Sequence, residues 1–117
     1  LAIKPDYAEA HSNLGATLKE LRQLDAAAKS YQNALAIKPD YAEAHSNLGS
    51  ALRELGQLDL ALASYEKAVE IKKDLAEAIA GIGTILLTKN QHKDGIQKLR
   101  IAYGIISFDI ENGFSIQ

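Results

Sequence analysis

The sequence predicts an all-helical solenoid built from three repeated units of 34 residues. Its first 15 residues, LAIKPDYAEAHSNLG, return letter for letter at residues 35–49, and residues 1–34 and 35–68 are identical at 25 of 34 positions. Chance does not produce such agreement, and repeats with a period of roughly 20–50 residues are typical of solenoids. A weaker copy begins at Val69, so the expected units are 1–34, 35–68 and 69–102.

Composition narrows the class of protein. The 117 residues are 47% hydrophobic, which suffices for one packed domain, and the net charge is −2 with acidic and basic residues interleaved. Without a basic stripe, nucleic acid is not an expected partner. Without an apolar run of about 18 residues, no membrane span is expected, and a soluble, cytoplasmic protein is favoured. Because residues 1–4 repeat a segment that is expected to end a helix, we expect a piece of a longer array.

Each unit is expected to open with a helix that starts near residue 7, 41 or 75. Pro5 and Pro39 should end the preceding helix, because proline lacks the backbone N–H and disfavours helix at the residue before it. An aspartate followed three residues later by glutamate predicts a capping box at each start. These pairs are Asp6–Glu9, Asp40–Glu43 and Asp74–Glu77.

Glycines mark two further features of the first helices. Gly15, Gly49 and Gly83 lie in mid-helix, where glycine costs about 1 kcal/mol relative to alanine. We therefore expect the backbone of a neighbouring helix to approach closely there. Gly56 follows the second of these helices and is expected to adopt a left-handed conformation, which Arg22 should adopt at a cost in the first unit.

The second helix of each unit is expected at about 24–37, 58–71 and 92–103. Ala27, Tyr31 and Ala34 share one of its faces, and this face should receive the first helix of the next unit. Beyond it, residues 105–110 alternate apolar and polar side chains, which predicts a strand, and Asn112-Gly113 predicts a hairpin turn. Residues 103–117 are thus expected to be a non-repeat tail that caps the array or begins another domain.

The combination of Leu14-Gly15, Ala27, Tyr31, Ala34 and Pro39 within a unit of 34 residues resembles the tetratricopeptide repeat over residues 1–102. Two features depart from that family: His11, His45 and Ile79 replace its aromatic residue, and Lys73 replaces its proline. The resemblance implies antiparallel helix pairs in a right-handed superhelix, whose first helices line a concave groove that holds an extended peptide.

The resemblance places twelve candidate partner-binding residues in this groove. They are Glu9, Ser12, Asn13, Lys19, Glu20, Glu43, Ser46, Asn47, Ser50, Arg53, Glu54 and Thr84. Asn13 and Asn47 resemble the asparagine ladder of O-linked N-acetylglucosamine transferase, and an amide can pair with any peptide backbone. They could instead be solvated groove residues. Glu9 and Glu43 could act only by capping and stabilising the starts of their helices. The chaperone-tail carboxylate clamp is rejected, because Ser12, Ala16, Glu77 and Gly81 stand at its positions.

No pattern of catalytic or metal-ligating residues emerges. His11 and His45 lack a second ligand four residues away, so packing is favoured over metal binding. Without a nucleophile–base pair or a phosphate-binding loop, we expect no enzyme activity, metal or cofactor. The leading hypothesis is a non-catalytic module that binds a protein or peptide segment. The alternatives are a scaffold arm of a larger enzyme and a homo-oligomer formed through exposed repeat ends.

Overall fold

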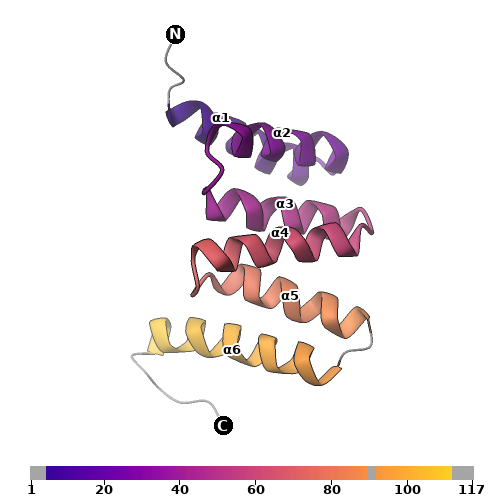
Figure 1. The fold of residues 1–117 in the computed structure, drawn as a ribbon, viewed down its shortest axis with the longest axis vertical. Coiled ribbons are helices and arrows are strands. Elements are labelled where there is room, and N and C mark those ends of the chain that lie inside the picture. Colours follow the sequence, from indigo (N-terminus) through magenta and orange to yellow (C-terminus); the bar gives the residue numbers. More distant parts are fainter. Residues whose placement is uncertain (1–4, 90–91, 112–117) are drawn as a thin grey trace.

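In the computed structural model, residues 5–89 and 92–111 are described, and within these ranges the chain forms six α-helices and no strand (Figure 1). The fold class expected from the sequence is therefore confirmed as an all-α solenoid. The helices are α1 (Pro5–Glu20), α2 (Leu24–Ile37), α3 (Ala42–Glu54), α4 (Leu58–Ile71), α5 (Ala76–Thr88) and α6 (His92–Glu111).

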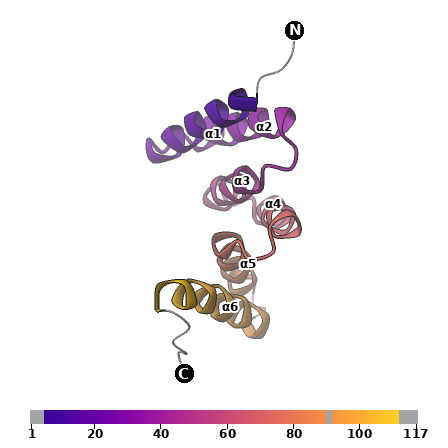
Figure 2. The same ribbon diagram turned by 90° about the vertical axis from the view of Figure 1, so that its left-hand side faces the viewer.

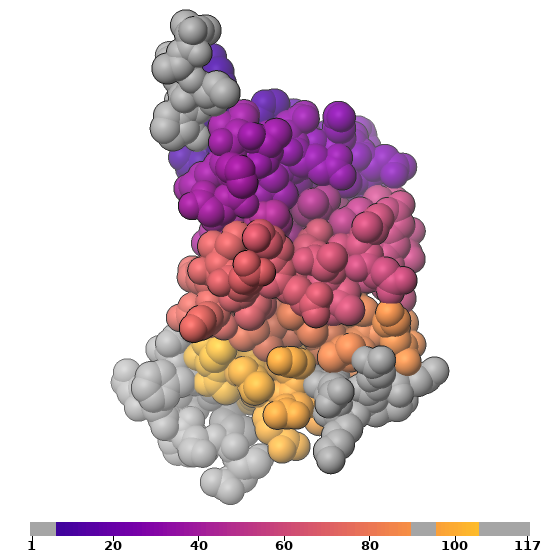
Figure 3. Space-filling view, viewed as in Figure 1, coloured from indigo at the N-terminus to yellow at the C-terminus, as the bar shows by residue number. Residues whose placement is uncertain are grey.

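The helices pack as three pairs stacked in chain order. Within each pair α1 packs on α2, α3 on α4 and α5 on α6, while α2 packs on α3 and α4 on α5 to join the pairs. In the view of Figure 2, α1, α3 and α5 follow one another along one side, with α2 and α4 on the other. Consecutive segments form successive bands of an elongated molecule of 53 × 32 × 25 Å (Figure 3). We call the side formed by α1, α3 and α5 the groove face.

The starts of α3 and α5, and those of α2, α4 and α6, keep the expected 34-residue spacing, whereas α1 begins earlier than the period predicts. The expected capping boxes are wrong. Tyr41 and Leu75 are the N-caps of α3 and α5, and neither makes a side-chain capping hydrogen bond. Asp40 lies one residue too early, inside a turn in which the Tyr41 N–H donates to the Lys38 carbonyl at 3.1 Å. α1 begins at Pro5, where the missing N–H is tolerated, so Asp6 is not an N-cap either.

The core repeats with the same period and is centred on tyrosine. Tyr31 and Tyr65 are 1% and 3% exposed. A Cβ atom at Gly15 would lie 2.8 Å from Tyr31 Cε1, and one at Gly49 would lie 2.9 Å from Tyr65 Cδ1. Glycine is needed because a tyrosine ring of the partner helix occupies this space. The expectation of a close helix backbone at these two positions is therefore wrong.

The turns that end α1 and α3 differ in sequence but share one backbone shape. Arg22 has φ of 65° and Gly56 has φ of 83°, so Arg22 adopts the left-handed conformation as expected. In both turns the following glutamine N–H donates to a leucine carbonyl five residues earlier, at 2.8 Å to Leu18 and 2.9 Å to Leu52. This hydrogen bond closes the end of the helix in the manner of a Schellman motif.

α6 contradicts the strand expected at residues 105–110, because the helix continues to Glu111. A strand there would need a partner strand for its backbone N–H and C=O groups, whereas a continuing helix satisfies them internally. α6 also packs on α5, with Ala102 only 2% exposed. The turn expected at residues 112–113 lies outside the described residues, and the division of the chain at residue 103 stays a prediction. None of the described helices combines the length and the apolar character needed to cross a bilayer.

Candidate functional site

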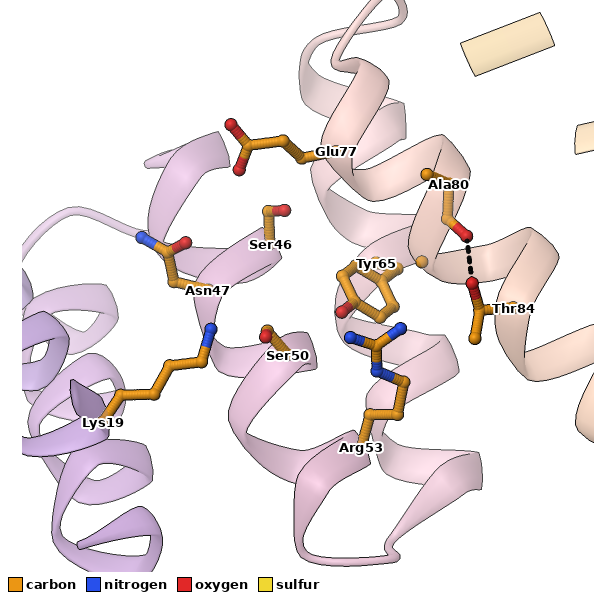
Figure 4. Close-up of a pocket in the computed structure, with 10 residues that line it drawn as sticks. Lys19, Ser46, Asn47, Ser50, Arg53, Tyr65, Glu77, Ala80 and Thr84 are labelled. Atoms are coloured by element: carbon orange, nitrogen blue, oxygen red, sulfur yellow. Dashed lines mark hydrogen bonds between the residues drawn. The ribbon is translucent and has the colours of Figure 1, made fainter. Parts of the chain in front are cut away.

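The candidate site is a pocket of about 260 Å³ on the groove face (Figure 4). It lies where the end of α1 and the lengths of α3 and α5 come together, with one side chain contributed by α4. The residues that line it are Lys19, Ser46, Asn47, Ser50, Arg53, Tyr65, Glu77, Ala80, Gly81 and Thr84. Most of these side chains are polar or charged, so the pocket suits a ligand that forms hydrogen bonds.

Helical periodicity places these residues together. Ser46, Ser50 and Arg53 follow one another at spacings of four and three residues on α3, so they share one helix face with the adjacent Asn47. On α5, residues 77, 80, 81 and 84 repeat the same spacing. Lys19 of α1 stands 34 residues before Arg53, at the equivalent place of the preceding unit. Because of the repeat, α1, α3 and α5 each turn an equivalent helix face toward the pocket.

Tyr65 of α4 reaches the pocket because α5 carries a glycine opposite its ring. A Cβ atom at Gly81 would lie 2.4 Å from Tyr65 Cζ, so no other residue fits without movement of the ring. Burial raises the pKa of the Tyr65 phenol above its ordinary value of 10.0. The phenol therefore keeps its proton at neutral pH and can donate a hydrogen bond.

The charges of the pocket are separated. Lys19 and Arg53 bring positive charge from α1 and α3, and Glu77 brings negative charge from α5. Figure 4 shows the charged ends of Lys19 and Arg53 on either side of Ser50, with Glu77 at the opposite end of the view. The Thr84 hydroxyl donates to the Ala80 carbonyl at 3.0 Å, so its hydrogen is already used within α5.

The pocket brings together half of the twelve residues expected from the sequence. Those in the pocket are Lys19, Ser46, Asn47, Ser50, Arg53 and Thr84. Those that do not line it are Glu9, Ser12, Asn13, Glu20, Glu43 and Glu54. The structure gives a reason for three of the latter: Ser12 is buried at 6% exposure, Glu43 pairs with Lys72 at 3.5 Å, and Glu54 pairs with Arg22 at 2.9 Å.

Sequence reasoning missed Tyr65 as a pocket residue, because its counterpart Tyr31 was placed on the packing face of the second helix and all twelve candidates came from the first helices. The signal that could have found it is Gly81, which stands where the earlier units have Asn13 and Asn47. A glycine on a groove position leaves room for a ring from the helix behind it. Glu77, Ala80 and Gly81 also line the pocket and were not among the twelve candidates.

The histidines were assigned to packing rather than to a metal. His45 Nε2 lies 2.9 Å from the Pro39 carbonyl oxygen, so its ring holds the turn before α3. In the parts of the chain that the structure describes, no group of three histidine, aspartate or glutamate side chains is arranged to hold a metal ion.

Stacked antiparallel helix pairs with a polar groove along their first helices define the chain as a helical-repeat solenoid. Comparison with protein families identifies the repeat: a model described as "TPR repeat" matches residues 17–52, and one described as "Tetratricopeptide repeat" matches residues 42–75. The chain belongs to the tetratricopeptide repeat family. No curated protein sequence matches it significantly.

Solved structures of similar fold support this assignment. A crystal structure of MamA is 26% identical, with a TM-score of 0.82 over 92% of this chain and 63% of that one. A second MamA structure is covered over 62% of its length, so the chain spans less than two thirds of either. The Arabidopsis OM64 TPR domain has a TM-score of 0.83 at 21% identity, over 95% of this chain and 88% of that domain.

Two further neighbours were solved with ligands. A yeast Sti1 structure titled "TPR2B-domain:pHsp70-complex" is 22% identical, with a TM-score of 0.83 over 92% of this chain and 85% of that one. The first TPR of Spaghetti (RPAP3) bound to an HSP90 peptide is 14% identical, with a TM-score of 0.83 over 96% of this chain and 85% of that one. At these identities the likeness concerns the fold.

Proposed function

We propose that this chain is a non-catalytic interaction module that holds an extended segment of a partner protein along its groove face. The observation that carries the proposal is the polar pocket between α1, α3 and α5, in which side chains of three successive units meet. A groove formed by successive units can follow an extended chain from one unit to the next. The peptide complexes of Sti1 and RPAP3 support the same use of this fold.

Asn13 and Asn47 are the residues we assign to the main chain of the bound segment. They stand one unit apart on α1 and α3, and Asn47 lines the pocket while Asn13 is exposed on the same register. α1 and α3 contact each other only to a small extent but are the first helices of neighbouring units, and an extended chain that rises roughly 3.3 Å per residue can reach from one to the other. Two amides could thus pair with one bound strand, whatever its sequence, because every residue carries the same backbone groups.

The test is the double substitution Asn13→Ala with Asn47→Ala. Each lost hydrogen bond is worth about 0.5–1.5 kcal/mol net, so binding should weaken by roughly 5- to 100-fold with little change in melting temperature. The probe is a fluorescein-labelled pool of decapeptides with varied sequence, acetylated and amidated at the ends so that terminal charges play no part. Fluorescence polarisation against wild type and the double variant gives the ratio of affinities.

Gln32→Ala is the matched control, because Gln32 is an exposed amide on α2 and lies outside the pocket. It should leave binding unchanged. Unchanged affinity in the folded double variant would remove the two asparagines from the binding surface and place the site elsewhere on the molecule.

A further inference from the structure

We propose that the pocket selects one acidic side chain of the bound segment, an aspartate or glutamate whose carboxylate lies between Lys19 and Arg53. The inference rests on the proposed function, because it names the chemistry of the segment that the groove holds. Its starting point is that two cations from neighbouring units line the same pocket.

Lys19 and Arg53 occupy equivalent positions of successive units, near the ends of α1 and α3. Both residues are partly buried. In Figure 4 the Lys19 side chain extends toward Ser50 from one side, and the Arg53 guanidinium lies on the other side of Ser50, next to the Tyr65 ring. An arginine guanidinium is planar and can donate two parallel hydrogen bonds to a carboxylate, to which a lysine ammonium adds a further donor.

Neither cation is neutralised within the described part of the chain. The ion pairs found there are Arg22–Glu54, Lys67–Glu70, Lys72–Glu43 and Lys89–Asp59. Glu54 directly follows Arg53 in sequence, yet it is held by Arg22 of the preceding unit, whose Nη1 donates to its Oε1 at 2.9 Å. Glu54 stays within electrostatic reach of Lys19 and Arg53, but its Oε1 is bonded to Arg22, and in the described residues neither cation forms an ion pair of its own.

Glu77 restricts the preference for an acidic side chain to one position of the bound segment. It lines the other end of the pocket and would repel a second acidic side chain placed there. The bound segment should therefore carry an acid at the position that meets Lys19 and Arg53, and a neutral or basic residue where it passes Glu77. A run of acidic residues would fit this pocket less well than a single one.

Capped decapeptide pools with one scanned position test the proposal. At that position the pools carry Asp, Asn, Glu, Gln, Lys or phosphoserine, and fluorescence polarisation measures binding at low salt. At one position the acidic pools should bind about 10-fold more tightly than the isosteric amide pools, as expected for hydrogen bonds to charged groups. Arg53→Gln should reduce this preference to less than about 2-fold, and Arg53→Glu should transfer it to the Lys pool.

Lys29→Gln is the matched control, because it removes the same charge from an exposed site on α2 outside the pocket. It should keep the full preference for the acidic pools. Circular dichroism melts check that each variant is folded. If Arg53→Gln unfolds, Lys19→Gln tests the same site from α1 and should reduce the preference by a similar factor.

The outcomes separate this inference from the proposed function. Equal binding of acidic and amide pools, with binding still weakened by the substitution of Asn13 and Asn47, would overturn the acidic selection and leave the interaction module standing. A preference for phosphoserine over glutamate of more than about 10-fold would overturn the carboxylate assignment in favour of a phosphorylated segment. Absence of binding by every pool would overturn both proposals.

Discussion

Helices α1 and α3 carry the same residues over their first halves but bury them differently. Leu14 of α1 is 50% exposed, whereas its repeat Leu48 of α3 is 7% exposed. The equivalent tyrosines differ in the same direction: Tyr7 is exposed, whereas Tyr41 is partly buried. The local sequence of the two segments is identical, so the difference arises entirely from what packs against them.

The structure supplies the cause. α2 packs on α3, while the only described helices that contact α1 are α2 and, to a small extent, α3. α2 covers one face of α3. No described helix covers the equivalent face of α1, which therefore remains exposed. In a repeat protein the stability of each unit depends on its own helices and on its neighbours, and here a buried position is created by the neighbour. Self-association through exposed repeat ends, one of the alternatives that the sequence left open, would use this α1 face.

The strongest test of the comparison replaces the two leucines separately. Leu48→Ala should destabilise the protein by about 2–5 kcal/mol, since it removes buried methyl groups and leaves a cavity. Leu14→Ala, the matched control with the same chemistry on α1, should cost less than about 1 kcal/mol because the side chain is half exposed. Urea denaturation followed by circular dichroism measures both. Equal losses would show that the α1 face is covered in solution.

The turns after the same two helices offer a second comparison. Arg22 and Gly56 share the left-handed conformation, which a side chain with a Cβ atom adopts only at a cost. Gly56→Arg should therefore destabilise the protein by about 1 kcal/mol. Arg22→Gly should be neutral or stabilising by up to about 1 kcal/mol, although it also removes the Arg22–Glu54 ion pair. Thermal melts of both variants measure the difference.

Glu54→Gln is the control for the ion pair, because it removes the charge partner of Arg22 and leaves the backbone of the turn unchanged. Exposed pairs contribute about 0–1 kcal/mol, so this variant should lose little. A clear loss of stability in Arg22→Gly, together with no loss in Glu54→Gln, would contradict the strain argument.

Much of the fold followed from the sequence because the repeat is nearly exact. One period located the helices, and register alone assigned the face of each first helix. The parts that failed depend on contacts beyond the local segment. Asp40 has the sequence of an N-cap but lies in the preceding turn. The alternation at residues 105–110 favours a strand, yet the helix already started at His92 continues through it.

The candidate site was predictable as a face but not as a pocket. Register placed Lys19, Asn47 and Arg53 on the groove face, and the pocket contains all three. The angle between successive helix pairs also decides which residues meet in one pocket. This angle cannot be predicted from the length of the repeat. Tyr65 was missed for this reason, because its ring enters from α4 through the space that Gly81 leaves.

The smallest expected effect concerns the pH dependence of the contact between the first and second units. The hydrogen bond from Arg22 holds the pKa of Glu54 below its ordinary value of 4.5. Glu54 therefore binds protons more readily in the unfolded chain, so the pair stabilises the fold above pH 4.5 and this contribution is lost as the pH falls through the lower pKa of the folded state.

Wild type should consequently lose slightly more stability than Glu54→Gln when the pH is lowered from 6 to 3, by less than about 1 kcal/mol because the pair is solvent-exposed. Asp59 adds a contribution of the same sign, since the hydrogen bond from Lys89 lowers its pKa as well, but it is present in both proteins and cancels in the comparison. Urea denaturation at each pH gives the two curves. Parallel curves would mean that Arg22 does not hold Glu54 in solution.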